Sequence, residues 1–140
     1  MYHLRYFLLL LAFCARFTGA CAQQLQNTAY QLYISQFKDL AIEQMQRYRI
    51  PASITLAQGL FESRAGQSRL ATVGNNHFGI KCHGWKGRSI NADDDAIGEC
   101  FRAYDNAKQS YEDHSKFLRN NQRYAMLFQL SSTDYRGWAR

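Results

Sequence analysis

The sequence has little of what would mark a linker, a disordered tail or a basic nucleic-acid-binding surface. Its 140 residues include one proline, Pro51, and we find no internal repeat and no low-complexity segment. The 17 lysines and arginines form no dense basic run, which argues against nucleic acid as a partner. A net charge of +6 is modest and would suit an anionic polymer. The composition therefore predicts one folded domain.

The N-terminus lacks an apolar run long enough to span a bilayer, and instead resembles a secretory signal peptide. Arg5 precedes an apolar stretch at 8–15, well short of the roughly 20 residues that a transmembrane helix needs. The sequence ACA at 20–22 fits the small-x-small rule for cleavage. We therefore expect residues 1–22 to be removed on export, and no transmembrane segment in the mature chain. Two arginines leave with the signal, so the net charge falls from +6 to +4. Lipid attachment at Cys21 is an alternative that would tether the protein without changing its chemistry.

Cysteine is scarce, and two of the four cysteines, Cys14 and Cys21, fall in the signal. Cys82 and Cys100 reach an oxidising compartment, where a disulfide between them would contribute about 3 kcal/mol. The alternative is a metal site formed by Cys82, His83, Cys100 and either His77 or His114. That spacing matches no standard zinc pattern, so we expect neither a metal nor another cofactor.

Hydrophobic periodicity predicts helices at both ends of the mature chain and strands between them. The expected helical segments are 29–48, 51–64, a short turn capped by Ser68, 110–121, and two final turns at 123–130 and 132–139. The expected strands are 77–82 and 98–104, forming an antiparallel hairpin fixed near its base by Cys82 and Cys100. This order predicts an α+β fold.

Glu62 is the strongest candidate for chemistry, because it ends the apolar helical run 54–61. Leu60, Phe61 and Phe78 are expected to desolvate its carboxyl group and raise its pKa, as a general acid requires. The alternative is a surface ion pair with Arg64, Arg69 or Lys81.

Several motifs in order resemble one bacterial family. They are ITLAQGLFESRAGQSRLA, NNHFGIKC, CFRAYDNAKQSYEDHSKFL and RYAMLF, and the resemblance covers nearly all of residues 30–140. The sequence is similar to the bacterial glucosaminidases of glycoside hydrolase family 73. The resemblance implies a lysozyme-like, mainly helical fold with a small hairpin lobe over the cleft. It also implies hydrolysis of the β-1,4 bond between N-acetylglucosamine and N-acetylmuramic acid in peptidoglycan.

The resemblance assigns the catalytic acid to Glu62 and a second carboxylate to the hairpin lobe. The candidates for the second are Asp93, Asp94, Asp95 and Glu99, of which we favour Asp94 or Asp95. A separation beyond about 6.5 Å from Glu62 would predict an inverting mechanism, and one near 5 Å a retaining mechanism. Assistance by the substrate's N-acetyl group is a third route.

The expected substrate-binding residues combine aromatic faces with polar groups, as sugars require. Tyr124 matches the tyrosine of the family's RYA motif, and Asn76, His77, Phe78 and Gly79 match the segment that forms the cleft floor. Asn76 would otherwise shape a turn, and Tyr124 would otherwise be a core tyrosine. Trp85 would either stack on a sugar or cap the core of the hairpin lobe.

The glucosaminidase domain is expected to occupy residues 23–140, as a monomer acting on glycan strands. The family continues beyond the equivalent of DYRGWA, so we expect the domain to be truncated at Arg140. One alternative function is a non-catalytic module that binds wall glycan. Another is a cysteine peptidase of wall peptides, with Cys82 as nucleophile and His114 as base.

Overall fold

The computed structural model describes residues 2–93 and 97–140, with side chains described from residue 24 onward except at residue 26. It contains two compact units, Met1–Leu32 and Tyr33–Arg140. The predicted signal and Cys21 lie where side chains are outside the description, so both stay predictions. Within the described part, no helix combines the length and apolarity that a membrane crossing requires.

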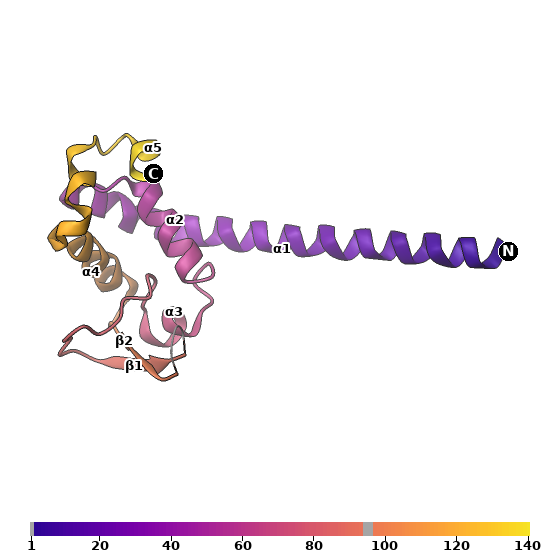
Figure 1. Cartoon of the computed structure of the whole chain (residues 1–140), viewed down its shortest axis with the longest axis horizontal. Helices are drawn as coiled ribbons and strands as arrows, with labels where there is room; N and C mark the ends of the chain where they lie inside the picture. The colour runs from indigo at the N-terminus through magenta and orange to yellow at the C-terminus, as the bar shows by residue number, and fades with distance from the viewer. Residues whose placement is uncertain (1, 94–96) are drawn as a thin grey trace. The chain divides into compact units, whose positions relative to one another are not determined.

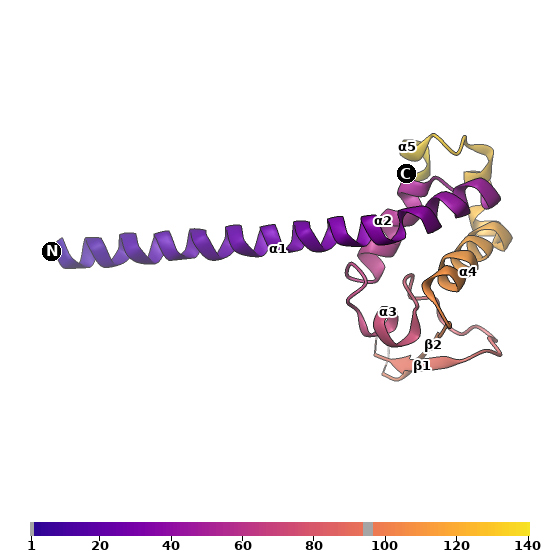
Figure 2. The same ribbon diagram turned by 180° about the vertical axis from the view of Figure 1, so that it is seen from behind.

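The chain is mostly helical, with one small antiparallel sheet (Figures 1 and 2). Its elements are α1 (Tyr2–Tyr48), α2 (Ala52–Glu62), α3 (Arg69–Gly74), β1 (Ser89–Ala92), β2 (Glu99–Arg102), α4 (Ala107–Asn120), η1 (Gln122–Gln129) and α5 (Tyr135–Trp138). The first unit consists of the first part of α1. In the second unit, α3 and the two strands lie at one end and α5 at the other, with α2 between them. The α+β prediction is confirmed.

Helix starts follow the capping residues in the sequence. The Ser68 side chain accepts a hydrogen bond from the Ala71 amide at 3.2 Å and caps α3, as predicted. Asn106 caps α4 by accepting from the Gln109 amide at 3.0 Å. Pro51 precedes the first residue of α2, where the helix leaves backbone N–H groups without an intrahelical partner. α4 therefore begins three residues before the predicted start at 110, whereas the predicted cap at Ser68 is confirmed.

Two buried clusters support the second unit. In the first, α1 turns Tyr33, Phe37 and Ala41 inward at four-residue intervals, and each is at most 9% exposed. The second joins Ile50, Leu118 and Trp138 from three separate segments of the chain. Partly buried residues of η1 pack against this second cluster, which ties the C-terminal turns to α4.

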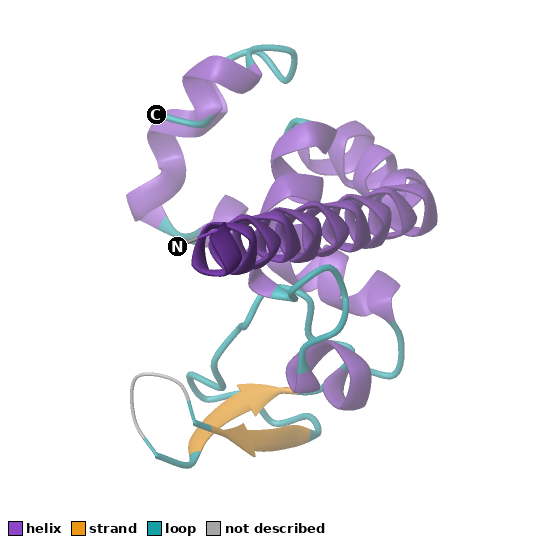
Figure 3. Cartoon of the chain, turned by 90° about the vertical axis from the view of Figure 1, so that its right-hand side faces the viewer, coloured by secondary structure: helices purple, strands orange, loops and turns teal. Residues whose placement is uncertain are grey.

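The structure contains the predicted antiparallel hairpin, but its first strand is β1 and not the predicted segment 77–82. β1 pairs with β2 in the register Ser89↔Arg102 to Ala92↔Glu99, and both strands appear in Figure 3. The predicted strand 77–82 is instead a turn followed by an irregular segment along the other side of β2. The Cys82 amide donates to the Cys100 carbonyl, and the Arg102 amide donates to the Ile80 carbonyl, each at 2.9 Å. The prediction failed because β1 has only four residues, so the alternation of Ser89, Ile90, Asn91 and Ala92 is too short to stand out in a polar segment.

Candidate active site

Glu62 is the last residue of α2, and a compact turn fixes the helix end behind it. Ser63, which is fully buried, donates from its amide and its hydroxyl to the Gly59 carbonyl, at 3.1 and 2.5 Å. The same hydroxyl accepts from the Gly66 amide at 2.7 Å. The backbone therefore presents Glu62 from a rigid support.

The carboxylate of Glu62 is exposed, so the predicted desolvation is wrong for the unliganded protein. Leu60 is buried as expected, but Phe61 is 70% exposed and does not shield its neighbour. The helix explains this outcome, because residues one apart point about 100° away from each other. Any desolvation of Glu62 must come from a bound substrate.

The alternative interpretation of Glu62 as half of an ion pair finds no support. Among the described residues, Glu62 forms no salt bridge with Arg64, Arg69 or Lys81. The Lys81 ammonium group instead lies 2.9 Å from the Glu99 carboxylate. Glu62 is therefore available for a ligand.

Two depressions meet at Glu62. The first has a volume of about 320 Å³ and the second about 350 Å³. The first is lined by Gln58, Glu62, Phe78, Gly79, Ile80, Lys81, His83, His114, Phe117, Leu118 and Tyr124. The second is lined by Glu62, Arg64, Gln67, Ser68, Arg69, Leu70, Gly79, Ala92, Asp93 and Phe101. Glu62 and Gly79 line both, so the two depressions adjoin at these residues, and we refer to them together as the groove.

Gly79 lines both depressions next to Glu62. Its φ of +60° lies in the left-handed region that glycine adopts readily, and a Cβ there would lie 4.0 Å from the Glu62 Oε2. A side chain at this position would project toward the carboxylate. The absence of one keeps the space beside Glu62 open.

Asn76 builds the turn that carries Gly79. Its Oδ1 accepts from the amides of Phe78 and Ile80, at 3.4 and 3.1 Å. Its Nδ2 donates to the carbonyls of Ile80 and Arg102, at 3.0 and 2.9 Å. Because Asn76 is 1% exposed and fully engaged, the structure favours a turn-forming role over direct contact with a sugar.

His77 also faces the interior rather than either depression. Its Nδ1 lies 3.1 Å from the Tyr33 hydroxyl, which in turn lies 2.9 Å from the Tyr111 hydroxyl. Burial lowers the pKa of His77 to about 4, so its ring is neutral at neutral pH. This network joins α1 and α4 behind the groove.

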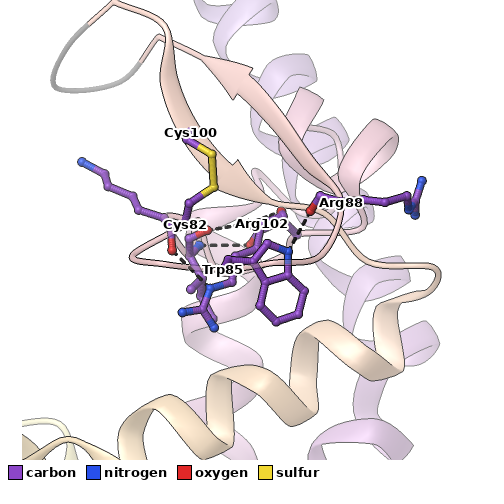
Figure 4. The surroundings of a disulfide bond; sticks show 8 residues. Cys82, Trp85, Arg88, Cys100 and Arg102 are labelled. Atoms are coloured by element: carbon purple, nitrogen blue, oxygen red, sulfur yellow. Dashed lines mark hydrogen bonds between the residues drawn. A yellow bond between two sulfur atoms is a disulfide. The ribbon is translucent and has the colours of Figure 1, made fainter.

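Trp85 caps the hairpin lobe, which we define as residues 81–104 (Figure 4). Its indole N–H donates to the Arg88 carbonyl at 2.8 Å, and the Arg102 guanidinium lies over the ring at 5.0 Å. Trp85 lines neither of the two depressions that contain Glu62. Of the predicted binding residues, Phe78, Gly79 and Tyr124 line the groove.

The predicted disulfide is present between Cys82 and Cys100, with Cα atoms 5.5 Å apart (Figure 4). Because the two sulfurs are bonded to each other, neither supplies the thiolate that a zinc site or a cysteine peptidase requires. Both alternatives based on Cys82 are therefore contradicted. Within the described part, no cluster of three or more His, Cys, Asp or Glu residues could hold a metal ion.

The favoured second carboxylates, Asp94 and Asp95, lie outside the described residues and stay predictions. Of the other candidates, Asp93 lines the 350 Å³ depression with Glu62, and its Oδ1 accepts from the Gly98 amide at 2.8 Å. Glu99 is engaged with Lys81. The hairpin lobe thus places at least one carboxylate on the groove wall.

Most of the chain matches one protein family. The model of the glucosaminidase family, described as mannosyl-glycoprotein endo-beta-N-acetylglucosaminidase, matches residues 38–140. The chain belongs to this family. The glucosaminidase match includes α2, the hairpin lobe and Tyr124, and therefore every side chain of the groove.

Several known proteins are similar to this chain in sequence or in structure. The chain is 32% identical over 98 residues to the exo-glucosaminidase LytG of Bacillus subtilis (strain 168), covering 70% of this chain and 34% of that protein. The catalytic domain of the autolysin Auto from Listeria monocytogenes matches with a TM-score of 0.59 and 31% identity, over 67% of this chain and 58% of that one. A peptidoglycan hydrolase from Sphingomonas sp. A1 matches with a TM-score of 0.61 and 29% identity, over 68% and 65%.

The glycoside hydrolase domain of FlgJ from Salmonella typhimurium matches with a TM-score of 0.60 and 25% identity, over 69% of this chain and 64% of that one. The chain thus spans about a third of the length of LytG and about six tenths of the solved chains. These likenesses confirm the lysozyme-like fold of a glucosaminidase.

The sequence did not predict that His114 lines the groove. It proposed His114 only as an alternative metal ligand or as the base of a cysteine peptidase. His114 is stacked on Phe78, with ring centroids 3.9 Å apart, and lines the depression that contains Tyr124. Burial lowers the pKa of His114 to about 4, and its Nδ1 has no partner within the described part of the chain. The helical spacing of Tyr111, His114 and Leu118 predicted only that this face of α4 is buried.

Proposed function

We propose that this protein is a peptidoglycan hydrolase, an endo-β-N-acetylglucosaminidase in which Glu62 protonates the leaving oxygen of a β-1,4 bond. The observation that carries the proposal is the position of Glu62 at the junction of two depressions. A glycosidase acting on a polymer must bind sugars on both sides of the bond that it breaks. A carboxyl group shared by two depressions has that arrangement.

The residues around Glu62 suit a sugar polymer. Phe78 and Tyr124 offer aromatic surface on one side, while Gln67 and Ser68 offer hydrogen-bonding groups on the other. Because Glu62 is exposed without substrate, we propose that the bound glycan supplies the desolvation that favours its protonated form.

We propose that Asp94 or Asp95 supplies the second carboxylate, since Asp93 brings this part of the hairpin lobe to the groove. The scissile bond is expected to leave N-acetylglucosamine at the new reducing end. Such a substrate requires export, which the predicted signal at 1–22 would provide, with tethering if Cys21 is lipidated. We expect a monomer that needs no cofactor.

The direct test replaces Glu62 with glutamine, which keeps the shape of the side chain but cannot donate a proton as a carboxylic acid does. Release of reducing ends from purified wall should fall at least 10²-fold, while the melting temperature stays unchanged. The matched control is Asp39→Asn, which removes an exposed carboxylate of α1 outside both depressions. Full activity in Glu62→Gln would refute the proposal.

Two further measurements define the reaction. Mass analysis of the released muropeptides should show N-acetylglucosamine at the new reducing end, whereas N-acetylmuramic acid would indicate a muramidase. The anomer formed first, followed by NMR, separates inversion from retention. Asp94→Asn and Asp95→Asn, measured side by side, should differ in activity if one of them is the second carboxylate. Wall binding by the wild type without any release of reducing ends would indicate a non-catalytic module.

A further inference from the structure

The three residues at 64–66 have an unusual backbone immediately after Glu62. Arg64, Ala65 and Gly66 all have positive φ angles, of 52°, 55° and 79°. Glycine adopts this region readily, but a residue with a Cβ pays a conformational cost there. Strain of this kind persists where the surrounding structure imposes it, and it is concentrated at functional sites. Arginine at the first of these positions therefore requires an explanation.

Arg64 is one of the residues that line the 350 Å³ depression, as Glu62 is. Besides Arg64 and Glu62, the described charged residues of that depression are Arg69 and Asp93. Arg69 donates to the Asn91 carbonyl at 2.7 Å, and Asp93 accepts from the Gly98 amide at 2.8 Å. The Arg64 side chain has no hydrogen bond or ion pair within the described residues. Its guanidinium is thus the uncommitted cation of this wall.

We propose that Arg64 binds a carboxylate of the substrate, on the peptide-bearing sugar or its peptide, and so favours anionic glycan over neutral glycan. The inference rests on the proposed function. In peptidoglycan every second sugar carries a lactyl ether and a short peptide with free carboxylates. A guanidinium can pair with a carboxylate through two parallel N–H···O bonds. At Arg64 this pair would form next to the bond that Glu62 would cleave.

Arg49 provides a matched control. It is also an exposed arginine with a positive φ, of 64°, but it lies between α1 and α2 and lines neither depression. Replacing either arginine with glycine removes one positive charge and relieves the same kind of backbone strain. Both Arg64→Gly and Arg49→Gly should therefore raise the melting temperature by a few degrees.

The experiment compares native wall with wall whose carboxylates have been converted to amides by carbodiimide and ammonia. On native wall at low substrate concentration, Arg64→Gly should lower the rate of reducing-end release about threefold to tenfold. On amidated wall it should change little, and Arg49→Gly should leave the ratio of the two rates unchanged. An Arg64→Gln variant, which keeps the Cβ, should lose selectivity without gaining stability.

Co-sedimentation with the two walls, performed in the Glu62→Gln background, tests the inference without catalysis. Stronger binding to native wall that disappears in Arg64→Gly supports it. Equal binding to both walls by the parent protein, or an equal loss on both walls in Arg64→Gly, overturns it. If the proposed function itself is wrong, the wild type will release no reducing ends from either wall. That result differs from every outcome of the binding experiment.

Discussion

The helical region of the second unit and the hairpin lobe face each other across Glu62, but different forces stabilise them. The helical region buries Ile50, Leu118 and Trp138 to 6% exposure or less. In the two strands of the hairpin lobe only Phe101 is buried, and the Cys82–Cys100 disulfide joins β2 to the segment beside it. The groove thus has one wall held by apolar packing, and one in which a disulfide and polar contacts add to the burial of Phe101, Ala103 and Tyr104.

The two tryptophans report on these regions separately. Trp138 belongs to the buried cluster of the helical region, and Trp85 caps the hairpin lobe. Fluorescence of the Trp85→Phe and Trp138→Phe variants therefore follows each wall by itself.

Acid should produce the largest effect. Burial lowers the pKa values of His77 and His114 from 6.5 to about 4. As the pH falls, the unfolded chain binds protons before the folded one does, so stability is full above about pH 6.5 and declines toward pH 4. The loss should be on the order of 5 kcal/mol for the two histidines together.

Urea unfolding between pH 4 and 7, followed through Trp138, measures this decline. His114→Gln should flatten the pH dependence, whereas replacing the exposed His83 with glutamine should not. An equal slope in all three proteins would show that other groups control acid unfolding.

Truncating the apolar core should come next. Ile50→Ala should lower the free energy of unfolding by about 2–5 kcal/mol, because it leaves a cavity beside Leu118 and Trp138. The control is Ile97→Ala in the hairpin lobe, where the side chain is 94% exposed and the change should stay below about 0.5 kcal/mol. Comparable losses in both variants would contradict the contrast between the two regions.

Removing the disulfide should act mainly on the hairpin lobe. With the two cysteines 18 positions apart, the double Cys82→Ser, Cys100→Ser variant should lose about 3 kcal/mol. Amide exchange of Arg102 should accelerate more than that of residues in α4. Uniform acceleration across the second unit would mean that the two walls unfold as one cooperative body.

Of these substitutions, apart from the controls, the one at Gly79, where the two depressions adjoin, should change stability least. Gly79→Ala should cost about 1–2 kcal/mol, because φ is +60° there. The added Cβ lies next to Glu62, so wall hydrolysis should fall more than stability does, with no shift in the Trp85 signal. A variant with unchanged turnover would show that substrate does not pass over Gly79.

Local signals in the sequence predicted the helices well. The caps of α3 and the period of α4 are properties of neighbouring residues, and the Cys82–Cys100 pair followed from export and from counting cysteines. Strand β1 escaped because its alternation extends over only four residues, in a segment that is otherwise polar. The exposure of Glu62 and Phe61 depends on how α2 is packed, which the apolar run alone does not determine.

The candidate site could also be predicted only where local sequence motifs determine it. Glu62, Phe78 and Tyr124 follow from motifs, but one hydrogen bond of Asn76 reaches Arg102, which lies 26 positions along the chain. Arginine gives no sign in a sequence that its backbone is left-handed, so the conformation of Arg64 could not be predicted. These features arise from packing between segments.

If the protein cleaves wall glycan as proposed, Gly79 bears on where along a glycan strand cleavage can begin. A groove that continues past Glu62 on both sides does not require a free chain terminus, because a polymer can lie across the carboxylate with sugars extending in both directions. Cutting would then begin in the interior of long strands. Mean strand length would drop early, well before monomers or disaccharides accumulate.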